Sequence, residues 1–317
     1  MRNLVILTLV VFLSGSAFAN YWEGDESNRW DVAGNWSDGV LPAAGDAVLV
    51  DTTTQAVTSD TILIDAATDA VCGDLNLGDG AADSTLYTLN MTGGTLTSNA
   101  LSIAHRGQSQ AEFNLSGGVV TTGDFLIGYG TGGADTTSGV MNMYGGELNF
   151  SGLWSIGGWS GNSGELNMYG GKITNIGTSW GLLLGDEGHA ILNMTGGEID
   201  LGDRTLFCPW NTVEGSEVHL DGGVFRAGTL DMDGYWSNKA GEGSIDISGR
   251  MLVIGGEWDA THDYVVNGYI TGYDDPGNLV FAYDFDMDVT EITAVPEPAT
   301  LMLLGLGGLG LARRRKH

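Results

Sequence analysis

The sequence predicts an all-β protein built as a parallel β-helix, a solenoid of about 25-residue turns with an N-terminal cap and a C-terminal strand segment. Two observations favour this fold: a Gly-Gly pair recurs at intervals of 24, 28, 25, 26 and 26 residues, and apolar residues alternate with polar ones around each pair. A third is that no stretch between the termini has a helical period, so parallel strands must follow one another without crossover helices. The pairs begin at positions 93, 117, 145, 170, 196 and 222.

Each repeat contains the same strand-like pattern on both sides of its Gly-Gly pair, and a second short strand follows. Stacking turns in register places equivalent residues in columns about 4.8 Å apart. One inward column is expected at Met91, Leu115, Met143, Met168, Met194 and Leu220, and another at Leu96, Val120, Leu148, Ile173, Ile199 and Phe225. A column of asparagines is expected at Asn90, Asn114, Asn142, Asn167 and Asn193. Their amides can bond to one another along the stack, which favours a stabilising ladder over a ligand-binding stripe.

Charged residues at the outward-facing positions provide a test of this register. Lys172 would lie between Glu147 one turn before it and Glu198 one turn after it. Asp200 would likewise lie opposite Arg226 of the next turn. Exposed pairs of this kind each contribute little to stability.

The repeats divide the chain into segments. We expect an N-terminal cap over residues 20–56, the solenoid over 57–254, and a C-terminal β segment over 255–294. Trp22, Trp30 and Trp36 are expected to cover the first turn, because an open solenoid end exposes strand edges and apolar core. Stacking of these tryptophans on sugar is the alternative.

Residues 1–19 have the layout of a secretory signal peptide. Arg2 supplies one positive charge, an apolar run covers positions 4–13, and Ala17 and Ala19 are small residues where signal peptidase reads the chain. Cleavage is expected between Ala19 and Asn20. A membrane anchor would need about 20 apolar residues.

The segment 295–317 holds three parts in order: a Pro-Glu-Pro motif, an uncharged stretch and a run of arginines. They are Pro296, Glu297 and Pro298, residues 299–312, and Arg313, Arg314 and Arg315. As a helix the uncharged stretch would be about 21 Å long, short of the ~30 Å hydrocarbon core. The basic run favours a cytoplasmic position for this end of the chain.

This arrangement resembles the PEP-CTERM sorting signal of exported bacterial proteins. The resemblance implies processing near the Pro-Glu-Pro motif by an exosortase, a membrane-embedded cysteine protease. It also implies export through the inner membrane to the cell envelope, the surface or the extracellular matrix, with membrane contact only through the tag and only before processing. The repeats and the tryptophan-rich segment before them resemble those of autotransporter-like solenoid proteins.

The chain is strongly acidic, with a net charge of −28. Five of its 12 basic residues and one of its 40 acidic residues, Glu297, lie in the two terminal segments, so the rest of the chain has a net charge of 7 − 39 = −32. Nucleic acid and anionic membrane are therefore not expected as partners. Cys72 and Cys208 would lie about five turns apart, roughly 24 Å, whereas a disulfide needs Cα atoms within ~7 Å. Both cysteines are expected to be free.

Three tryptophans are candidates for contact with a glycan. Trp154, Trp159 and Trp180, together with Trp210, occur in the loops and second strands of successive turns, where their rings could stack on sugar. The alternative is that they pack inward, since Trp154 occupies a position that Phe125 fills elsewhere. Exposure of these rings on one face would favour glycan binding.

No catalytic residues and no cofactor are indicated. A weak Ca²⁺ site could be formed by Asp284, Asp286 and Asp288, although these residues are better explained as the exposed face of an acidic strand. A glycosidase would need two carboxylates at a defined separation. The sequence does not indicate which two of its 40 acidic residues would form such a pair. We therefore expect a structural or adhesive protein of the cell envelope or extracellular polysaccharide matrix. A polysaccharide-binding module is the main alternative, and a β-helix polysaccharide lyase or glycosidase is less favoured.

Overall fold

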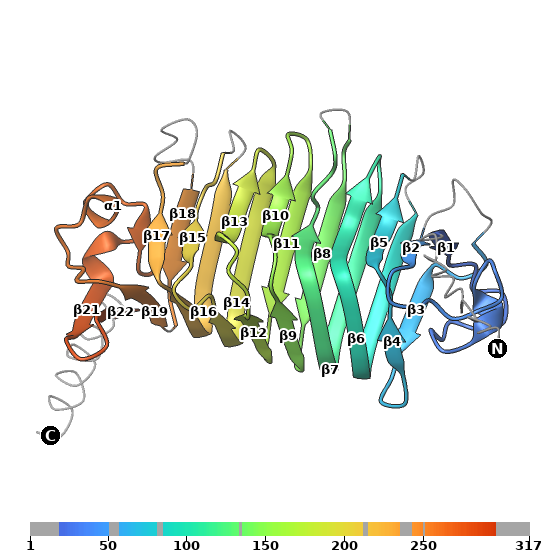
Figure 1. Ribbon diagram of the computed structural model, residues 1–317. Coiled ribbons are helices and arrows are strands. Elements are labelled where there is room, and N and C mark those ends of the chain that lie inside the picture. Colours follow the sequence, from blue (N-terminus) through green and yellow to red (C-terminus); the bar gives the residue numbers. More distant parts are fainter. Residues whose placement is uncertain are drawn as a thin grey trace, which may run out of the picture.

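The computed structural model describes residues 19–50, 57–80, 85–132, 135–211, 215–234, 243–249 and 251–295. These residues form a β-solenoid of about 9 turns with about 26 residues per turn. Strands account for 59% of the structure and helices for 4%. The predicted all-β parallel solenoid is therefore confirmed. Figure 1 shows an elongated stack with the N-terminal segment at one end and the last hairpin at the other.

Each turn contributes strands to three faces, which the parallel pairings define. Face I contains β3 (Thr61–Ile64), the first parts of β6 (Leu86–Arg106), β7 (Gln110–Ile127), β14 (His189–Asp200) and β16 (Ser216–Ala227), and β8 (Ser138–Met143), β11 (Ser163–Met168), β18 (Gly243–Ile247) and β20 (Ile270–Thr271). Face II contains β4 (Asp69–Val71), β9 (Glu147–Phe150), β12 (Lys172–Asn175), β19 (Met251–Gly255) and the following parts of β6, β7, β14 and β16. Face III contains β1 (Ala19–Tyr21), β2 (Ala47–Val50), β5 (Asp74–Asp79), the ends of β6 and β7, β10 (Trp154–Gly158), β13 (Gly181–Asp186), β15 (Thr205–Phe207) and β17 (Thr229–Asp231).

The interior is filled by the columns that the repeat predicts. Residues of the Met91 column on face I and of the Leu96 column on face II are buried, at 0% or 1% exposure, in one continuous core. Face III adds a third column, which includes Leu101, Phe125 and Leu182. Since neighbouring turns share this core, each turn is stabilised mainly by the turn before and after it.

The recurring Gly-Gly pairs form the corner between face I and face II. The second glycine of every pair has a φ between +72° and +90°, where side chains are strained. The turns also approach too closely there for a side chain: a Cβ atom on Gly146 would lie 2.8 Å from the carbonyl oxygen of Gly118. The Gly-Gly pair therefore recurs because every turn has the same tight corner.

The predicted asparagine ladder is present on the outside of face I. Nδ2 of each asparagine donates to Oδ1 of the asparagine one turn before it. The distances are 3.1 Å for Asn114 to Asn90, 3.0 Å for Asn142 to Asn114, 3.1 Å for Asn167 to Asn142 and 2.9 Å for Asn193 to Asn167. The amides thus satisfy one another along the stack.

The predicted charge register on face II is also present. Lys172 pairs in register with Glu147 and Glu198, and its Nζ atom lies 3.4 Å from Oε1 of Glu198. Arg226 lies opposite Asp200, and its Nε atom lies 3.8 Å from Glu198.

At the N-terminal end, Trp22, Trp30 and Trp36 are at most 2% exposed. The ring of Trp36 packs edge-to-face on the other two, with centroids 5.1 Å and 4.8 Å away. The short 3-10 helix η1 (Ala33–Asn35) connects Trp30 to Trp36 along the chain. This burial is consistent with a role in covering the first turn. It also means that these rings are not accessible for stacking on a sugar.

At the C-terminal end, β21 (Leu279–Asp284) and β22 (Val289–Ala294) form an antiparallel hairpin. β22 pairs antiparallel with β19 and so occupies the edge of face II. A short helix α1 (Asp263–Val266) and the 3-10 helix η2 (Pro276–Asn278) complete this end.

The hairpin corrects the expectation of an acidic strand face at Asp284, Asp286 and Asp288. Residues 285–288 form the turn, because Oδ1 of Asp284 accepts from the backbone N–H groups of Asp286 and Met287 at 2.9 Å and 3.2 Å. Asp288 accepts a hydrogen bond from the Tyr283 hydroxyl at 2.6 Å. The carboxylates of Asp284 and Asp288 therefore stabilise the turn.

Cys72 and Cys208 are both free and buried, as predicted. Burial raises the pKa of each thiol to about 12, because the interior disfavours the thiolate.

Candidate functional site

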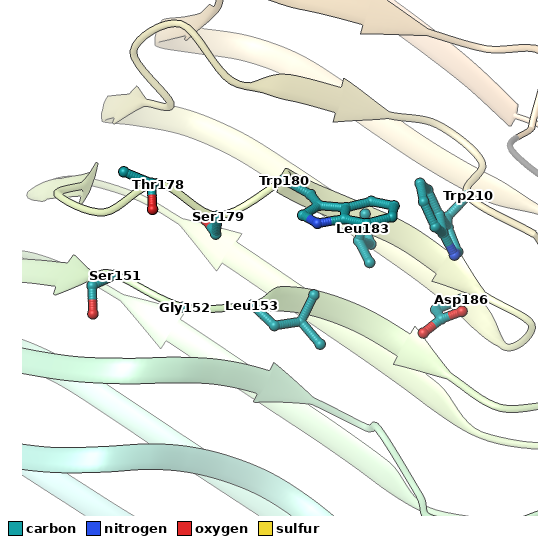
Figure 2. A pocket seen from close by; sticks show the side chains of 9 residues that line it. All are labelled: Ser151, Gly152, Leu153, Thr178, Ser179, Trp180, Leu183, Asp186 and Trp210. Atoms are coloured by element: carbon teal, nitrogen blue, oxygen red, sulfur yellow. The ribbon is translucent and has the colours of Figure 1, made fainter.

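A groove of about 520 Å³ lies on the outer side of face III, between the turn of β10 and the turn of β13 (Figure 2). Leu182 and Leu184 of β13 point into the core, so Leu183 between them faces outward. The groove is lined by Ser151, Gly152, Leu153, Thr178, Ser179, Trp180, Leu183, Asp186 and Trp210. Its volume is within the range of small-molecule binding sites.

The floor of the groove belongs to a small apolar cluster outside the main core. Leu183 and Phe207 are register partners on β13 and β15, and Trp210 packs on Phe207 edge-to-face with centroids 4.6 Å apart. Leu153 of the preceding turn packs against this cluster. All three buried members are at most 8% exposed, which fixes the ring of Trp210 firmly.

Trp180 forms one wall, immediately before β13. Its side chain is 56% exposed, and its ring meets that of Trp210 edge-to-face at 5.3 Å. The corner depends on glycine on both sides: Gly181 has a φ of +124°, and a Cβ atom on Gly177 would lie 2.0 Å from the Ser151 carbonyl oxygen. The chain can therefore turn closely over residues 151–153 and present the indole to solvent.

Asp186 is the single ionisable side chain among the residues that line the groove. It ends β13 and lies next to Trp210 in Figure 2. Burial, and then the negative charge of Glu187, raise the pKa of Asp186 to about 6. Near pH 6 this carboxyl group can both donate and accept hydrogen bonds. Hydrolysis by paired carboxylates would need a second acid in the lining.

Trp154 is not a ligand contact, contrary to the sequence-based expectation. It is fully buried, stacked on Phe125 at 5.7 Å and edge-to-face with Phe150 at 5.0 Å. The register explains this, because Trp154 pairs with Phe125 and Leu182 in the inward column of face III.

Trp159 and Trp180 are both exposed, at 41% and 56%. Trp159 follows the end of β10, whereas Trp180 precedes the start of β13, so the two lie at opposite ends of face III strands. Trp159 does not line the groove. The structure therefore brings Trp180 together with Trp210 rather than with the other two candidates.

Two contributors to the groove were not identified from the sequence as site residues. Leu183 and Asp186 lie in a strand whose sequence reads as an ordinary apolar run. Trp210 was noticed only as one of several loop tryptophans. The aromatic residues between positions 180 and 210 could have indicated an aromatic cluster. Only the register of the strands shows which of these rings are in contact.

The remaining expected site residues fall at the ends of the chain. The Pro-Glu-Pro motif, the three arginines and Ala17 lie outside the described residues. Ala19 and Asn20 belong to β1, where they pair with Ala47 and Val48. Within the described residues, no three His, Cys, Asp or Glu side chains are grouped so as to hold a metal ion.

Two kinds of observation define the class of this protein: the solenoid and the tag after it. The PEP-CTERM protein-sorting motif matches residues 294–316. The chain is thus an exosortase-targeted protein exported to the cell envelope or surface. No curated protein and no solved structure matches the chain. In the part of the chain that the structure describes, no helix is long and apolar enough to cross a membrane.

Proposed function

We propose that this protein is a structural or adhesive component of the cell envelope or the extracellular polysaccharide matrix. The observation that carries the proposal is the continuous stack of about 9 turns. Such a stack is a stiff spacer whose length is set by the number of turns. Its acidic surface opposes collapse onto other acidic molecules. Removal of residues 1–19 and processing near Pro296 would precede this role.

Comparison of three strains tests this role. One lacks the protein, one produces the full chain, and one produces a chain without residues 294–316. We expect the full chain to increase cell aggregation and the protein content of the washed matrix, and the shortened chain to restore neither. Equal aggregation in all three strains would contradict a structural or adhesive role.

A second candidate function, polysaccharide binding, is favoured by the groove between Trp180 and Trp210. The two functions are compatible, because a matrix spacer is held in place by what it binds. Retention of the purified chain on insoluble glycans, with the Trp180→Ala variant as comparison, tests this candidate. Unchanged retention of that variant would exclude the groove as the binding site.

A further inference from the structure

We infer that the groove beside Trp180 binds a short stretch of an uncharged hexopyranose chain, with a sugar ring stacked on the exposed face of the Trp180 indole. The inference rests on the proposed polysaccharide-binding function and names its ligand class. Three features of the groove support it: a fixed aromatic platform, an apolar floor beneath it and the charge of the lining.

The platform is rigid before any ligand arrives. Trp180 is 56% exposed, yet its ring is held by Trp210, which is itself packed on Phe207 in a buried cluster. One face of a pyranose ring carries C–H groups and is apolar, so it can cover an indole while its hydroxyl groups remain outside. A ring that is already fixed loses little conformational freedom on binding, which favours affinity.

Beneath Trp180 the groove is lined by the backbone of Gly152. A Cβ atom on Gly152 would lie 2.1 Å from Oδ1 of Asp124 in the preceding turn, and that oxygen accepts a hydrogen bond from the Leu153 N–H at 2.7 Å. A side chain at Gly152 would therefore disturb the position of Leu153. Leu153 and Leu183 continue the apolar floor, and the space of about 520 Å³ suits one or two sugar rings.

The polar groups of the lining fit hydroxyl groups better than ions. The hydroxyls of Ser151, Thr178 and Ser179 lie at the Trp180 end, and Asp186 lies at the other. No lysine, arginine or histidine is among these described lining residues, so an acidic sugar would meet no positive charge. Burial of Asp186 works against its negative charge. A group of this kind is suited to exchange hydrogen bonds with an uncharged ligand.

The overall charge of −28 makes one control essential. A cationic polymer will associate with so acidic a surface without any specific site, and that association will weaken with salt. Stacking on Trp180 should persist at high salt, because it does not depend on ionic attraction. Salt dependence therefore separates the groove from the surface.

Affinity electrophoresis of the purified full chain tests the inference. The probes are three neutral polymers (hydroxyethyl cellulose, dextran and soluble starch), one anionic polymer (alginate) and one cationic polymer (chitosan). We expect retardation by at least one neutral polymer at both 0.05 M and 0.5 M salt, and none by alginate. Trp180→Ala should weaken this binding at least tenfold, and Trp180→Phe should stay within about threefold of the wild type. Trp159→Ala, which removes an exposed ring outside the groove, should have no effect.

Two results would overturn the inference. One is equal binding of neutral polymers by the wild type and Trp180→Ala. The other is binding to chitosan alone that disappears at 0.5 M salt. Neither result would bear on the structural role, which is measured by aggregation and matrix content of the strains.

Discussion

Nδ2 of Asn167 donates a hydrogen bond of 3.1 Å to Oδ1 of Asn142, the equivalent residue one turn earlier. Four such bonds join five asparagines along face I. Each inner member both donates and accepts, so removal of one amide leaves two neighbours with unmet hydrogen-bonding groups. The asparagine ladder therefore helps to hold successive turns in register.

Replacement of Asn142 by alanine should destabilise the solenoid more than replacement of Asn90. Asn142 donates to Asn114 and to Glu112 and accepts from Asn167, whereas Asn90 accepts one ladder bond. We expect a loss of about 2 kcal/mol for Asn142→Ala and about 1 kcal/mol or less for Asn90→Ala. Urea unfolding followed by circular dichroism measures both. Equal losses would show that the ladder bonds contribute little.

Replacement of Trp154 by alanine should be severely destabilising. Its ring is fully buried between Phe125 and Phe150, so truncation leaves a large cavity. We expect a loss of about 3–5 kcal/mol in the free energy of unfolding. Trp159→Ala is the matched control and should change it by no more than about 0.5 kcal/mol. If the two variants were equally stable, Trp154 would not belong to the core.

Both cysteines should be unreactive in the folded protein. Burial raises the pKa of each thiol to about 12, so almost no thiolate exists at pH 8. We expect no labelling by iodoacetamide under native conditions and two labels per chain after unfolding in guanidinium, measured by mass spectrometry. Label uptake limited to one site after unfolding without reductant would indicate a modified or paired cysteine instead.

The stability of the fold should depend on pH through Asp186. Because the pKa of Asp186 is raised to about 6 in the folded state, the folded chain binds its proton more tightly than the unfolded chain does. The free energy of unfolding thus decreases as the pH rises from about 4 to 6, and it stays lower by the same amount above pH 6. Asp186→Asn removes this cost, so the variant should be about 1 kcal/mol more stable than wild type at pH 7.5 and no different at pH 4. A variant that is less stable at pH 7.5 would mean that the carboxylate makes favourable contacts.

The repeat accounts for most of what the sequence could predict. Stacked turns force equivalent residues into columns, so the spacing of Gly-Gly pairs was enough to place the inward columns of faces I and II, the asparagines and Lys172. It was also enough to separate Cys72 from Cys208. These features depend only on register, which a period near 26 residues determines.

Other features depend on how the chain bends, which the period does not determine. The sequence indicated two strands per turn, whereas the Gly-Gly corner divides the first of these into two faces. The sequence left Trp154 open between the core and a glycan contact, although its position matched that of Phe125, and the pairing with Phe125 and Leu182 assigns it to the core. The segment around Asp286 alternates as a strand would, yet hydrogen bonds to Asp284 make it a turn. The groove was hidden because Leu183 reads as core and instead lies outside it.

We propose that this solenoid is delivered outside the inner membrane and released there from its sorting tag. Cell fractionation combined with mass spectrometry of the mature C-terminus tests this proposal. We expect the protein in the envelope or matrix fraction, with a C-terminus near Pro296 and without residues 299–317. Recovery of a chain that is held in the inner membrane and still ends in residues 313–317 would contradict delivery and release.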